Sequence, residues 1–197
     1  MSAQTTYSFD MVKGDAGGIY DLAPYEINSF CNEAANGALA FGMGAVTGTK
    51  AGKSVKLPTA VTDTFEGIVT NRRTTERDLE GKLALRKGVT VGLMRYGRVW
   101  VALGTSVAAT YGDAVYLIVS GTDAGKFTNV STGALAINAK FIGAAENGIA
   151  PIELANCFTA GGTEYTLPAA TASTLGGVKV GTGLAVTSDG TLSVSEG

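Results

Sequence analysis

The chain has 197 residues, of which 45% are hydrophobic and only 16% are charged, and its formal net charge is −2. This length is enough for one domain with a hydrophobic core, and a composition rich in Val, Thr, Ala and Gly favours strands and turns over helices. A net charge this close to zero excludes the broad basic field that draws proteins to nucleic acid or to anionic membranes, so we expect neither partner.

Residues that usually carry catalysis are scarce. The chain contains no histidine, which removes the commonest general base, the commonest metal ligand and any Ser-His-acid triad. The two cysteines, Cys31 and Cys157, are too few and too far apart for a disulfide framework or a zinc site, and we expect two buried free thiols. Neither a secretory signal nor a run of roughly 18 apolar residues is visible, so we expect synthesis in a cytoplasm.

The first third of the chain predicts a long surface loop and then short strands. Residues 17–48 mix turn formers with short apolar runs, and only ALAFGMGAV (38–46) has the character of a strand. In SVKLPTAV (54–61) a proline interrupts an apolar run, which predicts an edge strand or the start of a strand, because proline donates no hydrogen bond to a sheet. TFEGIVTNRR (64–73) is a further short strand candidate.

Residues 71–88, NRRTTERDLEGKLALRKG, hold a large share of the charged side chains. Such a run is typical of a solvated loop, and it also suits a polar contact surface for a partner protein. Both interpretations remain open at this point.

The middle of the chain predicts two hairpins and two closing strands. In VTVGLMRYGRVWVALG (89–104) alternating apolar residues flank Gly97, which could supply the positive φ of a turn, and Trp100 would face away from Val99 and Val101. GDAVYLIVSGTDAGKFTNVS (112–131) repeats the pattern with GTDAG as its turn. KFIGAA (140–145) and APIELA (150–155) complete an all-β domain, a small antiparallel barrel or sandwich such as a jelly roll.

The composition changes after Cys157. We expect a β body over residues 1–157, a linker rich in Gly, Thr and Ala over 158–170, and a hairpin module over 171–197. A three-residue turn at 188–190 would pair Val186 with Leu192 and Leu184 with Val194, which places all four side chains on one face. A lone hairpin is marginal in water, so this face predicts either a threefold association of three copies or packing onto the chain's own body.

Possible catalytic and binding motifs do not fit their templates. GTKAGKS (48–54) is one residue shorter than a phosphate-binding loop and precedes a strand-like run instead of a helix. GVKVGTG (177–183) lacks the third glycine of a dinucleotide-binding loop. The carboxylates of Asp78, Glu80 and Glu153 have no evident partner for acid–base work. We therefore expect no enzymatic activity, no cofactor and no metal.

The order of motifs resembles the structural cement protein family of tailed bacteriophages, sometimes labelled Gp24-like. The resemblance covers roughly residues 15–155 and rests on the strand order, on the pairs Phe41-Gly42 and Ile142-Gly143, and on the stretches GRVWV (97–101) and GDAVY (112–116). It implies a decoration protein that binds the outer surface of the phage head, commonly as a trimer, and clamps neighbouring subunits of the major capsid protein. The segment ATASTLGGVKVGTGLAVTSDGTLSV (170–194) resembles short modules of phage tail fibres and spikes.

These observations predict two contact surfaces, one for the capsid and one for the trimer. We expect capsid contacts within the early loop 17–32 and the charged segment 72–87, and trimer contacts on the hairpin face. The rival interpretations are a minor tail or fibre protein and a glycan-binding module built around Tyr96 and Trp100. The expected capsid contacts are Arg72, Arg73, Arg77, Lys82, Arg86, Lys87, Tyr20 and Tyr25, and the expected trimer contacts are Leu184, Val186, Leu192 and Val194.

Overall fold

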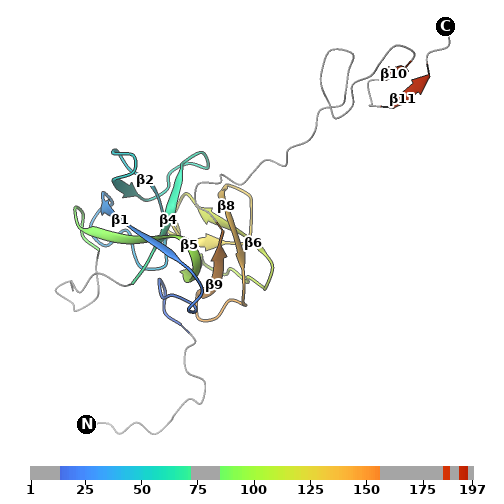
Figure 1. Ribbon diagram of the computed structural model, residues 1–197. Coiled ribbons are helices and arrows are strands. Elements are labelled where there is room, and N and C mark those ends of the chain that lie inside the picture. The colour runs from blue at the N-terminus through green and yellow to red at the C-terminus, as the bar shows by residue number, and fades with distance from the viewer. Residues whose placement is uncertain (1–13, 72–84, 156–183, 187–190, 195–197) are drawn as a thin grey trace, which may run out of the picture. The chain divides into compact units, whose positions relative to one another are not determined.

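The computed structural model describes residues 14–71, 85–155, 184–186 and 191–194 (Figure 1). The chain divides into two units, Met1–Gly161 and Gly162–Gly197, which are described separately below. No helix occurs among the described residues, and none there could span a membrane. The expected all-β class is therefore confirmed.

Nine strands of the first unit form one sheet, in the order β1-β3-β2-β4-β5-β9-β8-β6-β7. An additional pairing between β1 and β5 closes the first five strands of this order into a barrel. The strands are β1 (Glu26–Asn32), β2 (Gly44–Thr47), β3 (Ser54–Lys56), β4 (Phe65–Val69), β5 (Thr90–Ala102), β6 (Ala114–Ile118), β7 (Phe127–Thr128), β8 (Ala134–Phe141) and β9 (Ile149–Leu154).

The predicted hairpin at residues 89–104 is wrong, because β5 is one continuous strand of 13 residues. Its first half pairs with β1 and β4, and its second half pairs with β9 from Gly97↔Leu154 to Ala102↔Ile149. Gly97 does have a positive φ, of 120°. That conformation accompanies a register shift between Glu26 and Ile27 on the paired strand, so it marks an irregularity within the strand and not a turn. The single strand β5 therefore joins the barrel to the rest of the sheet.

Four other expectations need correction, and Cys157 lies outside the described residues. The early loop contains β1, which pairs with β3 and β5 over Glu26–Asn32. In ALAFGMGAV only the end, from Gly44, is a strand. β3 has neighbours on both sides and is no edge strand, and Pro58 follows it. Cys31 is an exposed free thiol because it alternates in β1 with the inward-facing Phe30 and Asn32.

The later strands agree with the prediction except for the position of β8. β6 and β7 pair antiparallel around the GTDAG turn, with Leu117 opposite Phe127. β8 and β9 pair through Phe141↔Ile152, but β8 spans Ala134–Phe141, so only the first two residues of the predicted strand KFIGAA (140–145) lie in a strand. Turn glycines flanked by alternating apolar residues are strong local signals of a hairpin, and they were sufficient to predict the pairing of β6 with β7.

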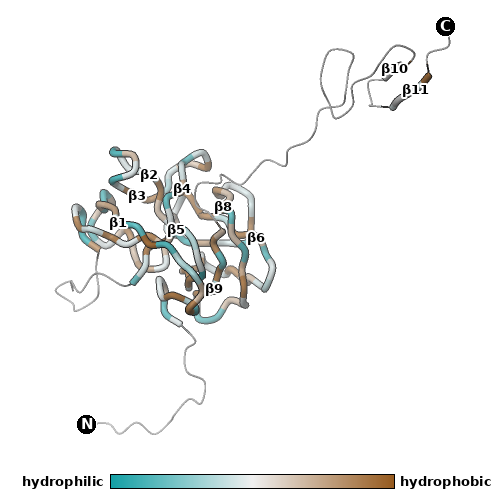
Figure 2. The backbone as a smooth tube through the Cα atoms, viewed as in Figure 1, coloured by the Kyte–Doolittle hydropathy of each residue, from teal (hydrophilic) through white to brown (hydrophobic). Residues whose placement is uncertain are grey.

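Two apolar clusters fill the body, and hydrophobic and hydrophilic residues are interspersed along its backbone (Figure 2). The larger cluster includes Val99 and Val101 of β5 and extends under β6, β8 and β9. The smaller cluster lies in the barrel and includes Phe30 and Leu93. Each such large buried side chain contributes about 1.5–3 kcal/mol, so these clusters make the body a rigid support for its surface.

The second unit contains the two-stranded sheet of β10 (Leu184–Val186) and β11 (Leu192–Val194). Leu184 pairs with Val194, and Val186 pairs with Leu192, which confirms the predicted register. The side chains of Leu184 and Val194 are 42% and 75% exposed. These two apolar side chains thus lack a full cover within the second unit.

Candidate partner-binding surface

The segment just before β1 is held against the second half of β5. The Gly17 amide donates to the Trp100 carbonyl at 2.8 Å, the Trp100 amide donates to Gly18 at 2.9 Å, and the Tyr20 amide donates to the Arg98 carbonyl at 3.0 Å. These alternating bonds resemble those of a paired strand. The backbone around Tyr20 therefore has a defined position relative to β5.

Side-chain charges reinforce this attachment. The Arg98 guanidinium lies 2.8 Å from the Asp21 carboxylate and 3.1 Å from that of Glu153 on β9. The hydrogen bond from Arg98 holds the pKa of Asp21 below its ordinary value, and the bond to Asp21 raises the pKa of Arg98. Arg98 thus links three segments that are distant in the sequence.

Large apolar side chains protrude around this attachment. Tyr20, Tyr25 and Tyr96 are each 41–46% exposed, and Leu22 is fully exposed. Tyr25 packs over Gly97, where an added Cβ would lie 2.6 Å from the Tyr25 Cβ. Tyrosine is enriched at protein interfaces, where an apolar ring and a polar hydroxyl both find contacts. We call these three tyrosines and one leucine the aromatic patch: Tyr20, Leu22, Tyr25 and Tyr96.

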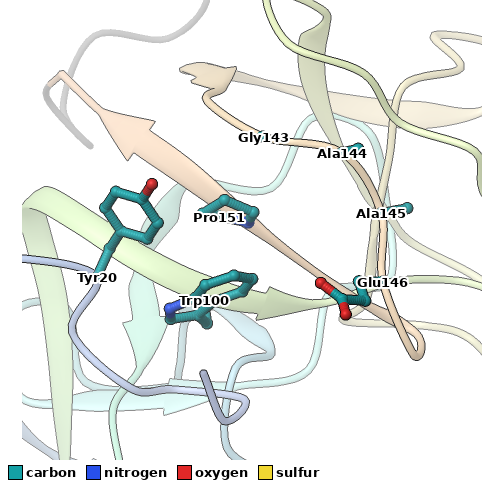
Figure 3. A pocket seen from close by; sticks show the side chains of 7 residues that line it. All are labelled: Tyr20, Trp100, Gly143, Ala144, Ala145, Glu146 and Pro151. Carbon is teal, nitrogen blue, oxygen red and sulfur yellow. The ribbon is translucent and has the colours of Figure 1, made fainter. Parts of the chain in front are cut away.

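A hollow of about 510 Å³ lies beside the aromatic patch (Figure 3). Tyr20 stands at one end and Glu146 at the other, with Trp100 and Pro151 between them. The Tyr20 and Trp100 rings are 5.5 Å apart at an interplanar angle of 51°. The rest of the lining is Gly143, Ala144 and Ala145 from the loop between β8 and β9.

Trp100 forms the floor of this hollow and is only 5% exposed. It faces away from the core residues Val99 and Val101, as expected. Gly14 lies directly on the indole, because a Cβ at that position would be 2.2 Å from Trp100 Nε1. A glycan site needs an accessible ring face for stacking, and Trp100 does not offer one.

A second hollow of about 400 Å³ lies elsewhere on the body. Its lining combines Thr105–Ala108 with residues of β6 and of the chain between β7 and β8. It contains neither an aromatic ring nor a carboxylate. A substitution in this second hollow can therefore serve as a control for the same substitution in the first hollow.

One buried ion pair lies inside the barrel. Arg95 Nη2 is 3.3 Å from Glu66 Oε2, and both side chains are at most 10% exposed. The Thr47 hydroxyl donates to Glu66 at 2.8 Å, and the Arg95 guanidinium lies 5.7 Å from the centre of the Phe30 ring. This pair is enclosed by β1, β2, β4 and β5, so it belongs to the architecture and not to the surface.

The GTKAGKS stretch is a tight turn between β2 and β3. The Glu33 carboxylate accepts hydrogen bonds from the Thr49 amide and hydroxyl, so an acid occupies donors that a phosphate would need. These bonds, led by that of the Thr49 hydroxyl, lower the pKa of Glu33 to about 2. No group of three potential metal ligands occurs within the described ranges either.

The expected contact residues do not all lie together. Tyr20 and Tyr25 are in the aromatic patch, beside the middle and second half of β5. Arg86 and Lys87 are exposed and precede the first residue of β5, where their backbone contacts Asn32 and Asn36. Arg72, Arg73, Arg77 and Lys82 lie outside the described residues, as do the side chains of Val186 and Leu192.

Sequence reasoning missed several residues of this surface. Leu22 carries no periodic signal, and Pro151 and Glu146 join Trp100 only through the register that pairs Trp100 with Pro151. The tight turn that pairs Glu146 with Ile149 was recognisable from its Asn-Gly dipeptide. No local sequence pattern indicated which strand would lie beside this turn.

Comparisons with known proteins agree with this all-β body. Residues 3–155 match the family model described as structural cement protein (E217 gp24/Pam3 gp6). A chain from the structure titled "The capsid of Myoviridae Phage XM1" has the same fold, with a TM-score of 0.63, 21% identity, and coverage of 79% of this chain and 98% of that chain. No curated protein matches the chain.

The family match ends at Ala155, so residues 156–197 lie beyond it, and their resemblance to fibre modules stays a prediction. The match covers most of the chain and all nine strands of the body. The chain therefore belongs to the phage structural cement protein family, whose members are capsid decoration proteins.

Proposed function

We propose that this protein binds the outer surface of the major capsid protein lattice as a homotrimer and braces the head against internal pressure. It acts as a binding protein and not as an enzyme, and it is made in the host cytoplasm before joining the virion. The observation that supports this role best is the aromatic patch. Tyr20, Leu22 and Tyr25 protrude from the segment before β1, which Arg98 and three hydrogen bonds attach to β5, and Tyr96 protrudes from β5 itself.

A rigid patch suits a brace because little conformational entropy is lost when it binds. Tyrosine rings provide large contact areas with only two rotatable side-chain bonds each. The other large apolar side chains exposed on the described body, Val61, Tyr111 and Val130, lie on three separate loops. The aromatic patch is therefore the part of the described body best suited to bury apolar area against the capsid.

The basic residues of the segment before β5 support the binding to the capsid in a secondary way. Arg86 and Lys87 are exposed near the first residue of β5 and could contact acidic groups of the capsid. Charges at the rim of an interface affect the association rate and its salt dependence more than the affinity. The remaining proposed capsid contacts are Arg72, Arg73, Arg77 and Lys82.

The trimer is assigned to the C-terminal hairpin. Leu184 and Val194 are exposed within the second unit and paired across β10 and β11. Because an isolated two-stranded hairpin is marginally stable in water, three copies around an axis would stabilise one another by covering these faces. Val186 and Leu192 complete the proposed contact.

A capsid-binding assay tests the proposal. Purified protein is mixed with heads of the phage that encodes it, prepared without it, and bound protein is measured by co-sedimentation. We expect saturable binding at a copy number comparable to that of the major capsid protein. A few copies per particle, located at the tail, would instead support a minor tail protein.

Light scattering tests the oligomeric state separately. We expect three times the chain mass at micromolar concentration, and a smaller mass when residues after Ala160 are deleted. A monomeric full-length protein would refute the trimer without affecting the capsid assignment.

A further inference from the structure

We propose that the hollow between Tyr20 and Glu146 receives a short extended segment of the capsid protein that carries an arginine or lysine next to proline or aliphatic residues. This inference rests on the proposed function, and it names the chemistry of the partner at one site. The hollow is lined by Tyr20, Trp100, Gly143, Ala144, Ala145, Glu146 and Pro151.

The lining selects an apolar ligand. Its volume of about 510 Å³ lies within the range of roughly 300–1,000 Å³ typical of binding pockets. The exposed Tyr20 ring forms one wall above a floor of the buried Trp100 and Pro151, while the glycine and the two alanines keep another wall low. An extended segment with proline or aliphatic side chains would cover the Tyr20 ring and this closed floor, and proline-containing segments lose little entropy on binding.

The charge of the hollow selects a basic side chain. Among the described residues that line the hollow, Glu146 is the only one that carries a charge at neutral pH, and it is exposed. Neighbouring Arg98 already contacts both Asp21 and Glu153, so its charge is satisfied by two carboxylates. A basic side chain at the Glu146 end would complement this carboxylate, and its carbon stem would rest on the apolar lining.

The position of the hollow fits a docking role. Tyr20 belongs both to its wall and to the aromatic patch, so one partner could occupy the hollow and cover the patch together. Gly14 and Trp100 keep the floor closed, and Pro151 is fixed opposite Trp100 by the pairing of β5 and β9. The hollow is therefore preformed, and a bound segment would not have to reorganise its floor.

Trp100 provides a direct readout because it is the only tryptophan of the chain. The probe is a blocked peptide, Pro-Pro-Arg-Pro-Pro, which contains no fluorophore, and the control peptide has glutamine in place of arginine. We expect a saturable change of Trp100 emission with the arginine peptide and at least fivefold weaker binding of the control peptide. Glu146→Gln should abolish this preference. Absence of any saturable change, or an unchanged preference in Glu146→Gln, would overturn the inference.

A second experiment uses the full-length protein and intact heads. Ala144 is an exposed residue of the hollow, so Ala144→Arg fills the site and places a like charge where the ligand's basic group would bind. Ala108→Arg makes the same change at an exposed alanine of the second hollow. We expect at least tenfold weaker head binding for Ala144→Arg and for Glu146→Lys, and unchanged binding for Ala108→Arg. Thermal melting curves verify that each variant protein is folded, and its mass by light scattering verifies that its oligomeric state is unchanged.

The outcomes separate the two proposals. If wild-type protein does not bind heads, the proposed function fails. If wild-type, Ala144→Arg and Glu146→Lys proteins bind equally, the function stands and the hollow is not a contact. If a protein lacking residues 1–13 binds the arginine peptide and the full chain does not, the chain's own N-terminal segment is the occupant, and the inference is overturned.

Discussion

Arg98 and Asp21 form an ion pair with a nitrogen–oxygen distance of 2.8 Å, and this pair connects the middle of β5 to the segment that carries Tyr20 and Leu22. Arg98 also contacts Glu153 of β9. Both partners of the pair are partly exposed, so solvent screens their attraction. Its main consequence is the position of the aromatic patch, and not the stability of the body.

Asp21→Asn should therefore weaken capsid binding more than it weakens folding. The Asp21 carboxylate also accepts a hydrogen bond from the Ala23 amide, which shapes the turn before Tyr25. We expect several-fold weaker binding to heads, because the patch loses part of its preorganisation. The melting temperature should change little. Co-sedimentation and thermal melting measure the two effects on the same sample.

The control for this variant removes a similar ion pair at another location. Lys126 contacts Asp123 at 2.8 Å within the turn between β6 and β7. Lys126→Gln should leave head binding unchanged. Equal loss of binding in both variants would mean that general destabilisation, and not the patch, limits binding.

Acid should destabilise the body through specific carboxylates. Hydrogen bonds, first that of the Thr49 hydroxyl, lower the pKa of Glu33 from 4.5 to about 2, and the bond from Lys126 lowers the pKa of Asp123 from 3.8 to about 2. A carboxyl with a lowered pKa in the folded state stabilises the fold fully above its ordinary pKa. This contribution is lost as the pH falls toward 2. We expect the urea midpoint to decrease between about pH 4.5 and 2.

Glu33→Gln tests the origin of this decrease. The variant should be less stable than wild type at pH 7 and should lose less stability on acidification, since it has no Glu33 carboxylate to protonate. Asp15→Asn, at an exposed carboxylate, serves as the control and should follow the wild-type profile. A Glu33→Gln profile parallel to wild type would show that other groups cause the acid sensitivity.

The sequence was informative where a turn and its flanking strands are neighbours. The β6–β7 hairpin and the β10–β11 register were predicted because turn length determines which residues face each other. The hollow could not be predicted in this way. Trp100 meets Pro151 through pairing of strands about 50 residues apart, and such registers depend on the packed core and not on local pattern.

Gly97 illustrates why the middle of the chain was harder. A glycine between two alternating apolar runs satisfies the requirements of a hairpin turn, and it satisfies equally those of an irregularity within one long strand. The distinction depends on Tyr25, whose Cβ occupies the space beside Gly97. That contact joins residues about 70 positions apart and has no local signature.

Gly97→Ala should destabilise the body strongly. The φ of 120° is strained for alanine, and its Cβ would lie 2.6 Å from the Tyr25 Cβ. Strain of this kind costs about 1–3 kcal/mol before the clash is added. Gly112→Ala provides the control, because its φ is 91° and no atom lies within 4 Å of an added Cβ. Urea denaturation should show a larger loss for Gly97→Ala, and equal losses would contradict the role of the Tyr25 contact.

The buried pair of Glu66 and Arg95 gives the last prediction. Glu66→Gln removes the carboxylate from a guanidinium that is about 10% exposed and lies inside the barrel. Breaking a buried pair by removing one partner typically costs about 3–5 kcal/mol, because the remaining charge stays buried and loses its carboxylate partner. We therefore expect Glu66→Gln to lower the free energy of unfolding by that amount. The double variant Glu66→Leu/Arg95→Met removes both charges, and its apolar side chains can pack against Phe30. It should be more stable than Glu66→Gln in the same urea titration, whereas a double variant less stable than the single one would show that the ion pair itself stabilises the barrel.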